Sequence, residues 1–341
     1  MAAFNTLHNR FKIMRNYYTA TDRPAYPQEV VIELTNHCNL ACIMCPHQTM
    51  QRPKGRMSAG LFQKIIDEIA GHTDLVYLYG TGETLLHKQF PELTHYAHAR
   101  GIATCISTNG MIMNETMALN LLTCGLDFLT VALDGGIRET YERIRVKGDF
   151  ALLVQNIHTL LRVKKETGST TRITLQMICM PENLHEIALF KALFTKEEHA
   201  LLHQFRFKPL HKTYLLERQD IRHTRPCFWL WNMMSIYWDG TVPLCCTDAD
   251  GAVRLGRVTE QTIHDIWHAE PLRAIRRAHQ LINYDTMPLC RSCNIPEQGY
   301  FNNLTIPGSL LVGSAWLRKL VPLYERLIML PFQRMKGVPS D

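Results

Sequence analysis

The sequence predicts an α/β fold, a partial (β/α)6 barrel of the TIM type followed by a small cysteine-rich α+β domain. Short apolar runs alternate with helical periods up to about residue 215, as is typical of parallel strands covered by helices. The alternation then stops, and the following stretch is rich in cysteine, tryptophan and turn residues. We therefore divide the chain into an N-terminal extension (1–27), a core (28–215), a cysteine-rich domain (216–300) and a hydrophobic, basic tail (301–341).

The expected strands are short and rich in β-branched and aromatic residues. They cover residues 30–34, 75–78, 102–106, 128–133, 173–178 and 205–207. Apolar residues at helical spacing predict a helix face at 61, 65, 66 and 69, and helices at 90–99, 115–122, 150–165 and 184–194. In a barrel of this type the active site lies at the carboxyl ends of the strands, where each motif below falls.

Composition is that of a globular protein, with 46% hydrophobic and 20% charged residues. Residues 1–18 lack the apolar core of a signal peptide, and no run of about eighteen apolar residues exists. We expect a cytoplasmic protein. The tail fits either packing against the protein's own barrel, which we favour, or contact with a membrane surface.

Eleven cysteines are many for such a protein, and their odd number and uneven spacing argue against a disulfide framework. Cys38, Cys42 and Cys45 form a CxxxCxxC group after the first expected strand. Three thiolates can hold three irons of a 4Fe–4S cluster and leave the fourth iron open for a ligand. A zinc knuckle or three buried thiols is the alternative.

This spacing resembles the hallmark of the radical S-adenosylmethionine (SAM) family. The resemblance implies that SAM chelates the open iron and is cleaved by one electron. The 5′-deoxyadenosyl radical so formed abstracts hydrogen from a C–H bond. Met44 departs from the pattern, because many relatives have an aromatic residue before the third cysteine.

Three further motifs follow expected strands in the order that the family shows, and the resemblance implies SAM-binding roles for them. Gly80, Gly82 and Glu83 resemble the family's GGE motif, with Thr81 inserted, and Ser107 and Asn109 resemble its ribose and carboxylate segment. Arg145 resembles an arginine that reaches the SAM carboxylate. An ordinary turn, or a solvated cation at Arg145, is the alternative for each.

A second group comprises Cys227, Cys245, Cys290 and Cys293. It resembles the SPASM extension of radical SAM enzymes in its shortened, "twitch" form, which implies one auxiliary 4Fe–4S cluster with four cysteine ligands. A structural zinc site is the alternative. Cys246, beside Cys245, fits a buried thiol, a substitute ligand, or a catalytic hydrogen donor of the kind an epimerase needs.

A single auxiliary cluster with four cysteine ligands favours a two-electron oxidation of a small polar substrate, such as a sugar or cyclitol. A peptide maturase, an epimerase, and a non-catalytic iron–sulfur or zinc protein are the alternatives. We expect a reducing partner such as flavodoxin or ferredoxin. No nucleic-acid partner is expected, because seven thiolates on two cluster cores reduce the formal charge of +6 to about +3.

Overall fold

The structure is a computed structural model that describes Tyr17, Thr21, Pro24 and residues 26–210 and 222–295. The expected tail, and with it the question of its membrane contact, lies outside these residues, as does most of the N-terminal extension. No helix in the described ranges is both long and apolar enough to cross a bilayer.

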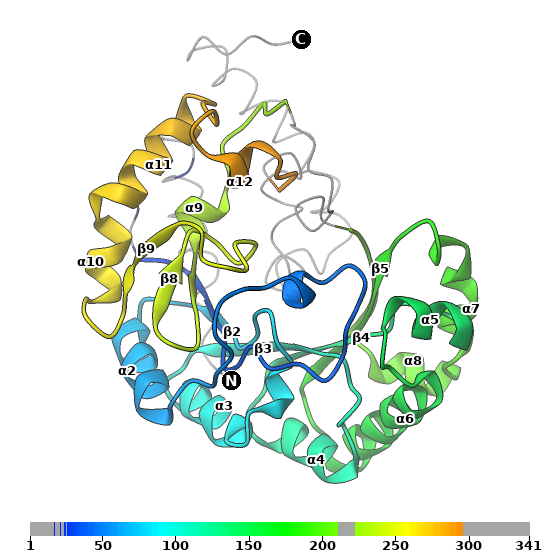
Figure 1. Ribbon diagram of the computed structural model, residues 1–341. Coiled ribbons are helices and arrows are strands. Elements are labelled where there is room, and N and C mark those ends of the chain that lie inside the picture. The colour runs from blue at the N-terminus through cyan, green and yellow to red at the C-terminus, as the bar shows by residue number, and fades with distance from the viewer. Residues whose placement is uncertain (1–16, 18–20, 22–23, 25, 211–221, 296–341) are drawn as a thin grey trace, which may run out of the picture.

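Seven parallel strands form the central sheet, in the order β6-β5-β4-β3-β2-β1-β7 (Figure 1). They are β1 (Glu29–Ile32), β2 (Leu75–Tyr77), β3 (Ala103–Thr108), β4 (Phe128–Ala132), β5 (Arg172–Cys179), β6 (Gln204–Pro209) and β7 (Met233–Ile236). Within the described residues, β6 and β7 are the two edges, so the barrel is open. The predicted partial barrel is confirmed.

The seventh strand was not expected. β7 comes from the cysteine-rich stretch but pairs in parallel with β1, with Val30 opposite Met234 and Ile32 opposite Ile236. The second part of the chain thus extends the core sheet. The short apolar run is interrupted by Ser235, so the sequence gives little sign of it.

Helices cover the outer face of the sheet (Figure 1). They are α2 (Ala59–Ile69), α3 (Phe90–Ala99), α4 (Glu115–Thr123), α5 (Arg138–Ile144), α6 (Phe150–Thr167), α7 (Ile187–Ala192) and α8 (Lys196–Leu201). Ser58, Asn114 and Asp149 cap α2, α4 and α6 through side-chain acceptors, as their residue types favour. Short 3-10 turns are η1 (Pro46–Gln48), η2 (Thr84–Leu86) and η3 (Leu184–Glu186). The helix expected at 184–194 is divided into η3 and α7.

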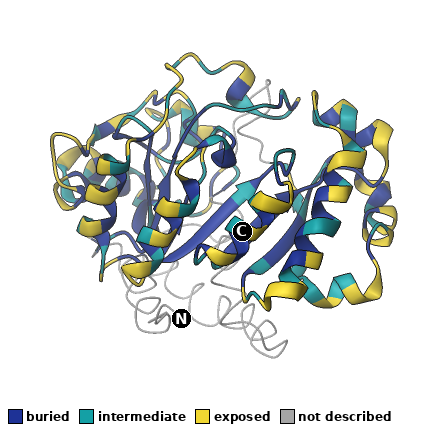
Figure 2. Cartoon of the chain, turned by 90° about the horizontal axis from the view of Figure 1, so that it is seen from below, coloured by how far each residue is buried: buried dark blue, intermediate teal, exposed yellow. Residues whose placement is uncertain are grey.

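The two faces of the sheet differ in character. The outer face packs on the helices in one large apolar cluster that includes Ile32, Val76, Ile106 and Leu175. The inner face carries a much smaller cluster, Val31, Leu75, Tyr77, Ala103, Cys105 and Phe128. Figure 2 shows the strands buried and the helices exposed on their outer sides. The inner face is therefore the side with room for polar side chains.

The C-terminal part is a hairpin with short helices. It consists of α9 (Trp229–Asn232), β8 (Thr241–Pro243), β9 (Arg254–Arg257), α10 (Ile263–His268), α11 (Glu270–Gln280) and α12 (Pro288–Arg291). Arg276 of α11 connects α9 and α10, because its buried guanidinium donates hydrogen bonds to the carbonyls of Leu230 and Trp267, both at 2.9 Å. The hairpin β8–β9 is antiparallel.

Candidate active site

The three cysteines of the first group lie in one loop between β1 and α2, over the carboxyl end of the sheet. Burial raises the pKa of Cys38 to about 11, and the charges of Glu83 and the other two thiols add to this effect. Burial also raises the pKa of Cys45. Without a metal the thiols of Cys38 and Cys45 would keep their protons at neutral pH, so a positively charged partner is needed to hold these two as thiolates.

Backbone hydrogen bonds anchor the cysteine loop to the segment after α5. The N–H of Ala41 donates to Val146 at 2.9 Å, and that of Ile43 donates to Ile144 at 3.0 Å. These bonds flank Cys42 on both sides. The loop therefore has a fixed position relative to the end of α5.

The glycine motif packs directly against the backbone that precedes Cys38. A Cβ atom on Gly82 would lie 2.5 Å from the carbonyl oxygen of Thr35 and 2.6 Å from that of His37. The N–H of Glu83 donates to the same His37 carbonyl at 2.8 Å. A Cβ on Gly80 would lie 2.7 Å from the Glu33 side chain. Glycine is thus required by the close approach of the two loops.

Glu83 and Asn109 connect the loops after β2 and β3. The buried Glu83 carboxylate accepts from the Thr108 hydroxyl at 2.7 Å, the Asn109 N–H at 2.8 Å and the Leu85 N–H at 3.2 Å. The Asn109 side chain donates in turn to Asn39 Oδ1 at 2.8 Å, inside the cysteine loop. Both residues lie beside the cysteine loop, but their side chains are engaged with protein groups.

Arg145 lies against the first cysteine group. Its guanidinium forms a fork on Asp134 Oδ2, with nitrogen–oxygen distances of 2.6 and 2.7 Å, and its Nη1 lies 3.5 Å from Cys42 Sγ. Although burial opposes it, the Asp134 carboxylate raises the pKa of Arg145. Ser107 lies on the inner face of β3, between Cys105 of the inner cluster and the loop. Direct contact of these residues with SAM stays a prediction.

The second cysteine group surrounds one small, mostly apolar pocket. Cys227, Cys245, Cys290 and Cys293 all line it, although up to 66 residues separate them in the sequence. Burial is the main cause of the raised pKa of Cys227, Cys245 and Cys290. In the described residues, no three His, Cys, Asp or Glu side chains form a group that could hold a single metal ion.

His279 lines the same pocket and was not singled out from the sequence. Its Nδ1 accepts from the N–H of Cys227 at 3.2 Å, which places the ring proton on Nε2. That Nε2 is buried, and no described residue forms a hydrogen bond with it. Burial lowers the pKa of His279 to about 3, so the ring is neutral. Four thiols and one orphaned N–H donor fit an iron–sulfur cluster, whose sulfur atoms accept hydrogen bonds.

Cys246 points away from this pocket. It packs against the inner cluster of the barrel, next to Tyr79, while its neighbour Cys245 lines the cysteine pocket. Burial raises the pKa of Cys246. Of the three roles considered for Cys246, a substitute ligand has the least support from this arrangement.

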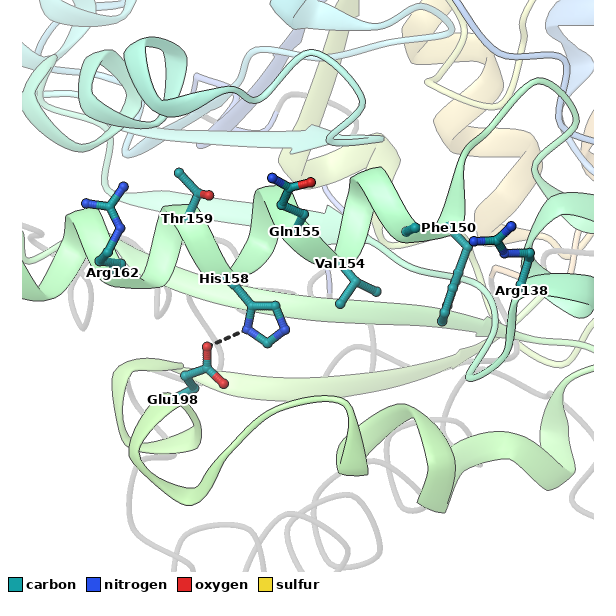
Figure 3. Close-up of a pocket in the computed structure, with 9 residues that line it drawn as sticks. Arg138, Phe150, Val154, Gln155, His158, Thr159, Arg162 and Glu198 are labelled. Carbon is teal, nitrogen blue, oxygen red and sulfur yellow. Dashed lines mark hydrogen bonds and ion pairs between the residues drawn. The ribbon is translucent and has the colours of Figure 1, made fainter.

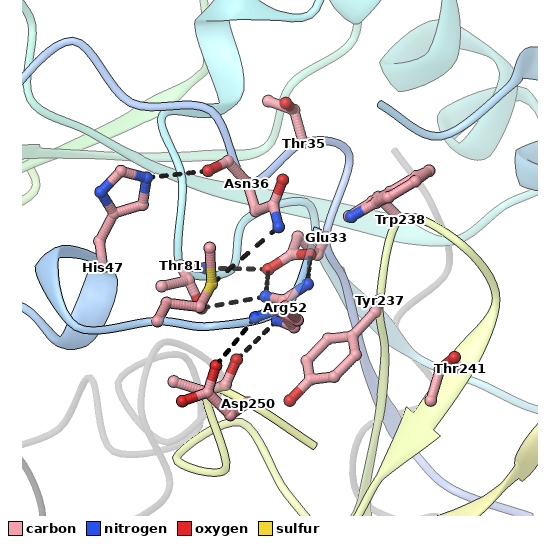
Figure 4. Close-up of polar contacts among 12 residues, drawn as sticks. Glu33, Thr35, Asn36, His47, Arg52, Thr81, Tyr237, Trp238, Thr241 and Asp250 are labelled. Carbon is pink, nitrogen blue, oxygen red and sulfur yellow. Dashed lines mark hydrogen bonds and ion pairs between the residues drawn. The ribbon is translucent and has the colours of Figure 1, made fainter. Parts of the chain in front are cut away.

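A polar network joins the cysteine loop to the C-terminal part, and sequence reasoning did not identify it (Figure 4). Arg52 forms a buried ion pair with Glu33, donates to the Ala249 carbonyl at 2.6 Å and lies 3.8 Å above the Tyr237 ring. Asp250 accepts from the N–H of Gln51 at 2.6 Å. Nearly 200 residues separate the partners, so no local pattern could reveal the contact.

A further groove lies elsewhere, on the outer face of α6. It has a volume of about 770 Å³ and includes the ion pair of His158 with Glu198 (Figure 3). None of the predicted site residues lines it. We therefore do not place the chemistry there.

Comparison with known proteins agrees with the fold. The model of the radical SAM superfamily matches residues 32–193, and that of the SPASM iron–sulfur cluster-binding domain matches residues 227–294. The chain thus belongs to the radical SAM superfamily and carries a SPASM domain, and it is an enzyme. Its cofactors are SAM, the 4Fe–4S cluster of the radical SAM domain and an auxiliary cluster.

Individual relatives are distant. The Fe-coproporphyrin III synthase of Methanosarcina barkeri is 32% identical over 171 residues, which are 50% of this chain and 41% of that protein. Streptococcus suis SuiB bound to its precursor peptide SuiA aligns with a TM-score of 0.61 at 13% identity, covering 89% of this chain and 79% of SuiB. BtrN in complex with AdoMet and 2-DOIA gives 0.54 at 17% identity, with 78% and 92% covered. The chain thus spans less than half of the curated relative, and the solved structures show the fold alone.

Proposed function

We propose that this enzyme cleaves SAM reductively at the Cys38–Cys42–Cys45 site and abstracts a hydrogen atom from a substrate C–H bond in the barrel interior. We further propose that the outcome is a two-electron oxidation of a small polar substrate, such as a sugar or cyclitol alcohol. The observation that carries the proposal is the placement of the two cysteine groups. The first caps the carboxyl end of the sheet, and the second reaches the interior through the Cys245–Cys246 pair.

Cys38, Cys42 and Cys45 would hold the first cluster, and Cys227, Cys245, Cys290 and Cys293 the second. When bound, the first cluster supplies the electron that cleaves SAM, and the second can accept the electron left after hydrogen abstraction and proton loss. The chain's own residues position and shield the site. Arg145 lies beside Cys42, and the Glu83–Asn109–Asn39 chain holds the cysteine loop over the sheet. A flavodoxin or ferredoxin stays the proposed electron donor.

Peptide modification is the second candidate, and epimerisation is the third. The solved structures that resemble this chain do not decide between a peptide and a small polar substrate. SuiB was solved with a precursor peptide, and BtrN was solved with 2-DOIA. Epimerisation is favoured only by Cys246, which packs against the inner cluster, where its thiol could return a hydrogen atom to a substrate radical.

The test is formation of 5′-deoxyadenosine by the anaerobically reconstituted protein with SAM and a strong reductant. A variant with Cys38, Cys42 and Cys45 all changed to Ala runs beside it, and Cys124→Ala serves as the matched control because this buried thiol belongs to neither group. We expect product from the wild type and the control only. Absence of product from a wild type that carries about four irons at the first site would contradict the proposal.

A further inference from the structure

We propose that Arg206 and Lys208, on the inner face of β6, bind an anionic group of the substrate, a carboxylate or a phosphate. This inference rests on the proposed function, because it names the substrate class of the same interior site. It goes beyond that function in assigning a charge to the substrate and two residues that recognise it.

The direction of both side chains follows from the strand. Phe205 and Phe207 alternate with them and pack outward on Phe190 of α7, with ring centroids 5.8 and 5.6 Å apart. Successive side chains of a strand point to opposite faces, so Arg206 and Lys208 point into the barrel. They lie beside Gln176 and Ile178 of β5 in the sheet register.

Electrostatic effects show which groups share this space. Arg206 counteracts the burial that raises the pKa of Cys105 on β3 and of Tyr79 after β2. Lys208 likewise counteracts the burial that raises the pKa of Cys246, and Cys246 counteracts the burial that lowers the pKa of Lys208. The two cations therefore face the volume enclosed by β2, β3, β6 and the loop that carries Cys246.

No acid in the described part of the chain pairs with either cation. The acids of this region have other partners. Asp134 pairs with Arg145, Glu33 with Arg52, and Asp248 accepts from the N–H groups of Ala252 and Val253. Glu83 accepts from Thr108, Asn109 and Leu85, and Glu29, which also acts on Tyr79 and Cys105, accepts from the Tyr77 hydroxyl. Burial and the nearby Arg206 lower the pKa of Lys208 to about 8. Two adjacent half-buried cations that no acid among the described residues neutralises are costly to the fold, and an anionic ligand would offset that cost.

The pair's position separates it from the expected SAM site. β6 is an edge strand, and β5, β4, β3 and β2 lie between it and β1, which leads into the cysteine loop. The resemblance places SAM against the loops after β2, β3 and β4, while Arg206 and Lys208 face the inner cluster near Cys246. A guanidinium fork beside an ammonium suits the paired oxygens of a carboxylate or phosphate.

Lys208 itself offers a direct test that needs no known substrate. The reconstituted holoenzyme, without reductant so that no SAM is cleaved, is treated at pH 8 with a trace of a small neutral acylating reagent. Labelling of Lys208 is followed by peptide mass spectrometry, with exposed Lys196 of α8 as the internal control. Inorganic phosphate and acetate are the two probes, added separately with and without SAM.

If either anion binds and raises the pKa of Lys208 by about one unit, its labelling slows about fivefold at pH 8 while Lys196 is unaffected. Arg206→Gln should remove most of this protection, and Arg206→Lys serves if the glutamine variant does not fold. Phosphate-only or acetate-only protection identifies the anionic group.

Three results would overturn the inference. Lys208 could resist labelling without any anion, could be labelled equally with and without both anions, or could be protected as strongly in Arg206→Gln. Protection by SAM alone, with no further effect of phosphate or acetate, would assign the pair to the SAM carboxylate instead. A failure of the proposed function is seen separately, as absence of 5′-deoxyadenosine, since labelling requires no turnover.

Discussion

The Glu83 carboxylate accepts three hydrogen bonds from protein donors, and two of those donors are the last residue of β3 and the residue after it. Burial raises its pKa although all three donors oppose that shift. A buried carboxylate so engaged has little capacity left for a ligand. We infer that Glu83 acts first as a positioning residue that joins two strand-end loops.

His279 allows a test at the second site that is independent of activity. Its buried Nε2–H lines the cysteine pocket and has no hydrogen-bond partner in the described part of the chain, so a bound cluster would accept its hydrogen bond. Hydrogen bonds to the sulfur atoms of a cluster stabilise the reduced form, so His279→Phe should lower the reduction potential of the auxiliary cluster. An EPR-monitored redox titration measures it.

The matched control is His264→Phe, the same change at an exposed position on α10. We expect no shift of the potential in this variant. An unchanged potential in His279→Phe with full iron content would show that the Nε2–H does not face the cluster.

At this scale, what the sequence could predict depended on distance along the chain. Cys38, Cys42 and Cys45 fall within eight residues, so their spacing alone predicts a shared site. His279 and Arg52 acquire their roles from partners 52 and about 200 residues away, which no local pattern encodes. Cys246 was recognised, but which way it points depends on packing against the barrel.

At the scale of single elements, the loops after β1 and β2 lie so close together that one added methyl group would clash with the backbone. Gly82→Ala would place a Cβ 2.5 Å from the Thr35 carbonyl oxygen, and neither atom can rotate away, because the oxygen belongs to the backbone and the backbone fixes the position of the Cβ. We expect a loss of about 1–3 kcal/mol in stability and a lower iron content at the first site. Thermal unfolding and iron analysis of the reconstituted protein measure both.

Gly60→Ala is the control, because nothing lies within 4 Å of the added Cβ and the position is an exposed one in α2. This variant should be as stable as the wild type or more stable by about 0.5–1 kcal/mol. Equal stability of the two variants would contradict the close approach of the loops.

The Arg52–Glu33 pair gives a second prediction for the same loop. Both side chains are buried, at 8% and 2% exposure, so Arg52→Met leaves an uncompensated carboxylate and should cost about 3–5 kcal/mol. The double variant Glu33→Gln with Arg52→Met should recover part of this loss, because the buried charge is removed. Chemical unfolding of four proteins, the wild type, Arg52→Met, Glu33→Gln and the double variant, gives the coupling free energy between the two residues.

Arg257→Met removes an arginine from the exposed pair with Asp239, in which Arg257 is 46% exposed, and should cost less than about 1 kcal/mol. If Arg52→Met lowers the free energy of unfolding no more than Arg257→Met does, the network in Figure 4 does not stabilise the cysteine loop.

On the scale of the whole molecule, the alternation of strands and helices was enough to predict the open barrel and its six strands. It could not predict β7, because that strand follows a break in the pattern and its short apolar run is interrupted by Ser235. Its place in the sheet is set by pairing with β1 from the other end of the chain. The second cysteine group is therefore mounted on the core sheet itself.

This continuity predicts that the first 210 residues do not form an independent fold. Without β7, the β1 edge and the apolar surface beneath Met234 and Ile236 would be exposed. Expressed alone, residues 1–210 should aggregate or bind a hydrophobic dye. Co-expressed with residues 222–341 as a separate chain, they should stay soluble, and the two pieces should purify together.

Ile236→Asn in the second piece should abolish the association, because this β7 side chain is 1% exposed and packs in the outer cluster. Leu281→Asn is the matched change at a position that is 78% exposed, and it should leave the two pieces together. A monomeric 1–210 piece that unfolds cooperatively on its own would contradict the role of β7. Since the same strand leads through Tyr237 to the Arg52 network and on to Cys245, its loss should also weaken iron binding at the first site.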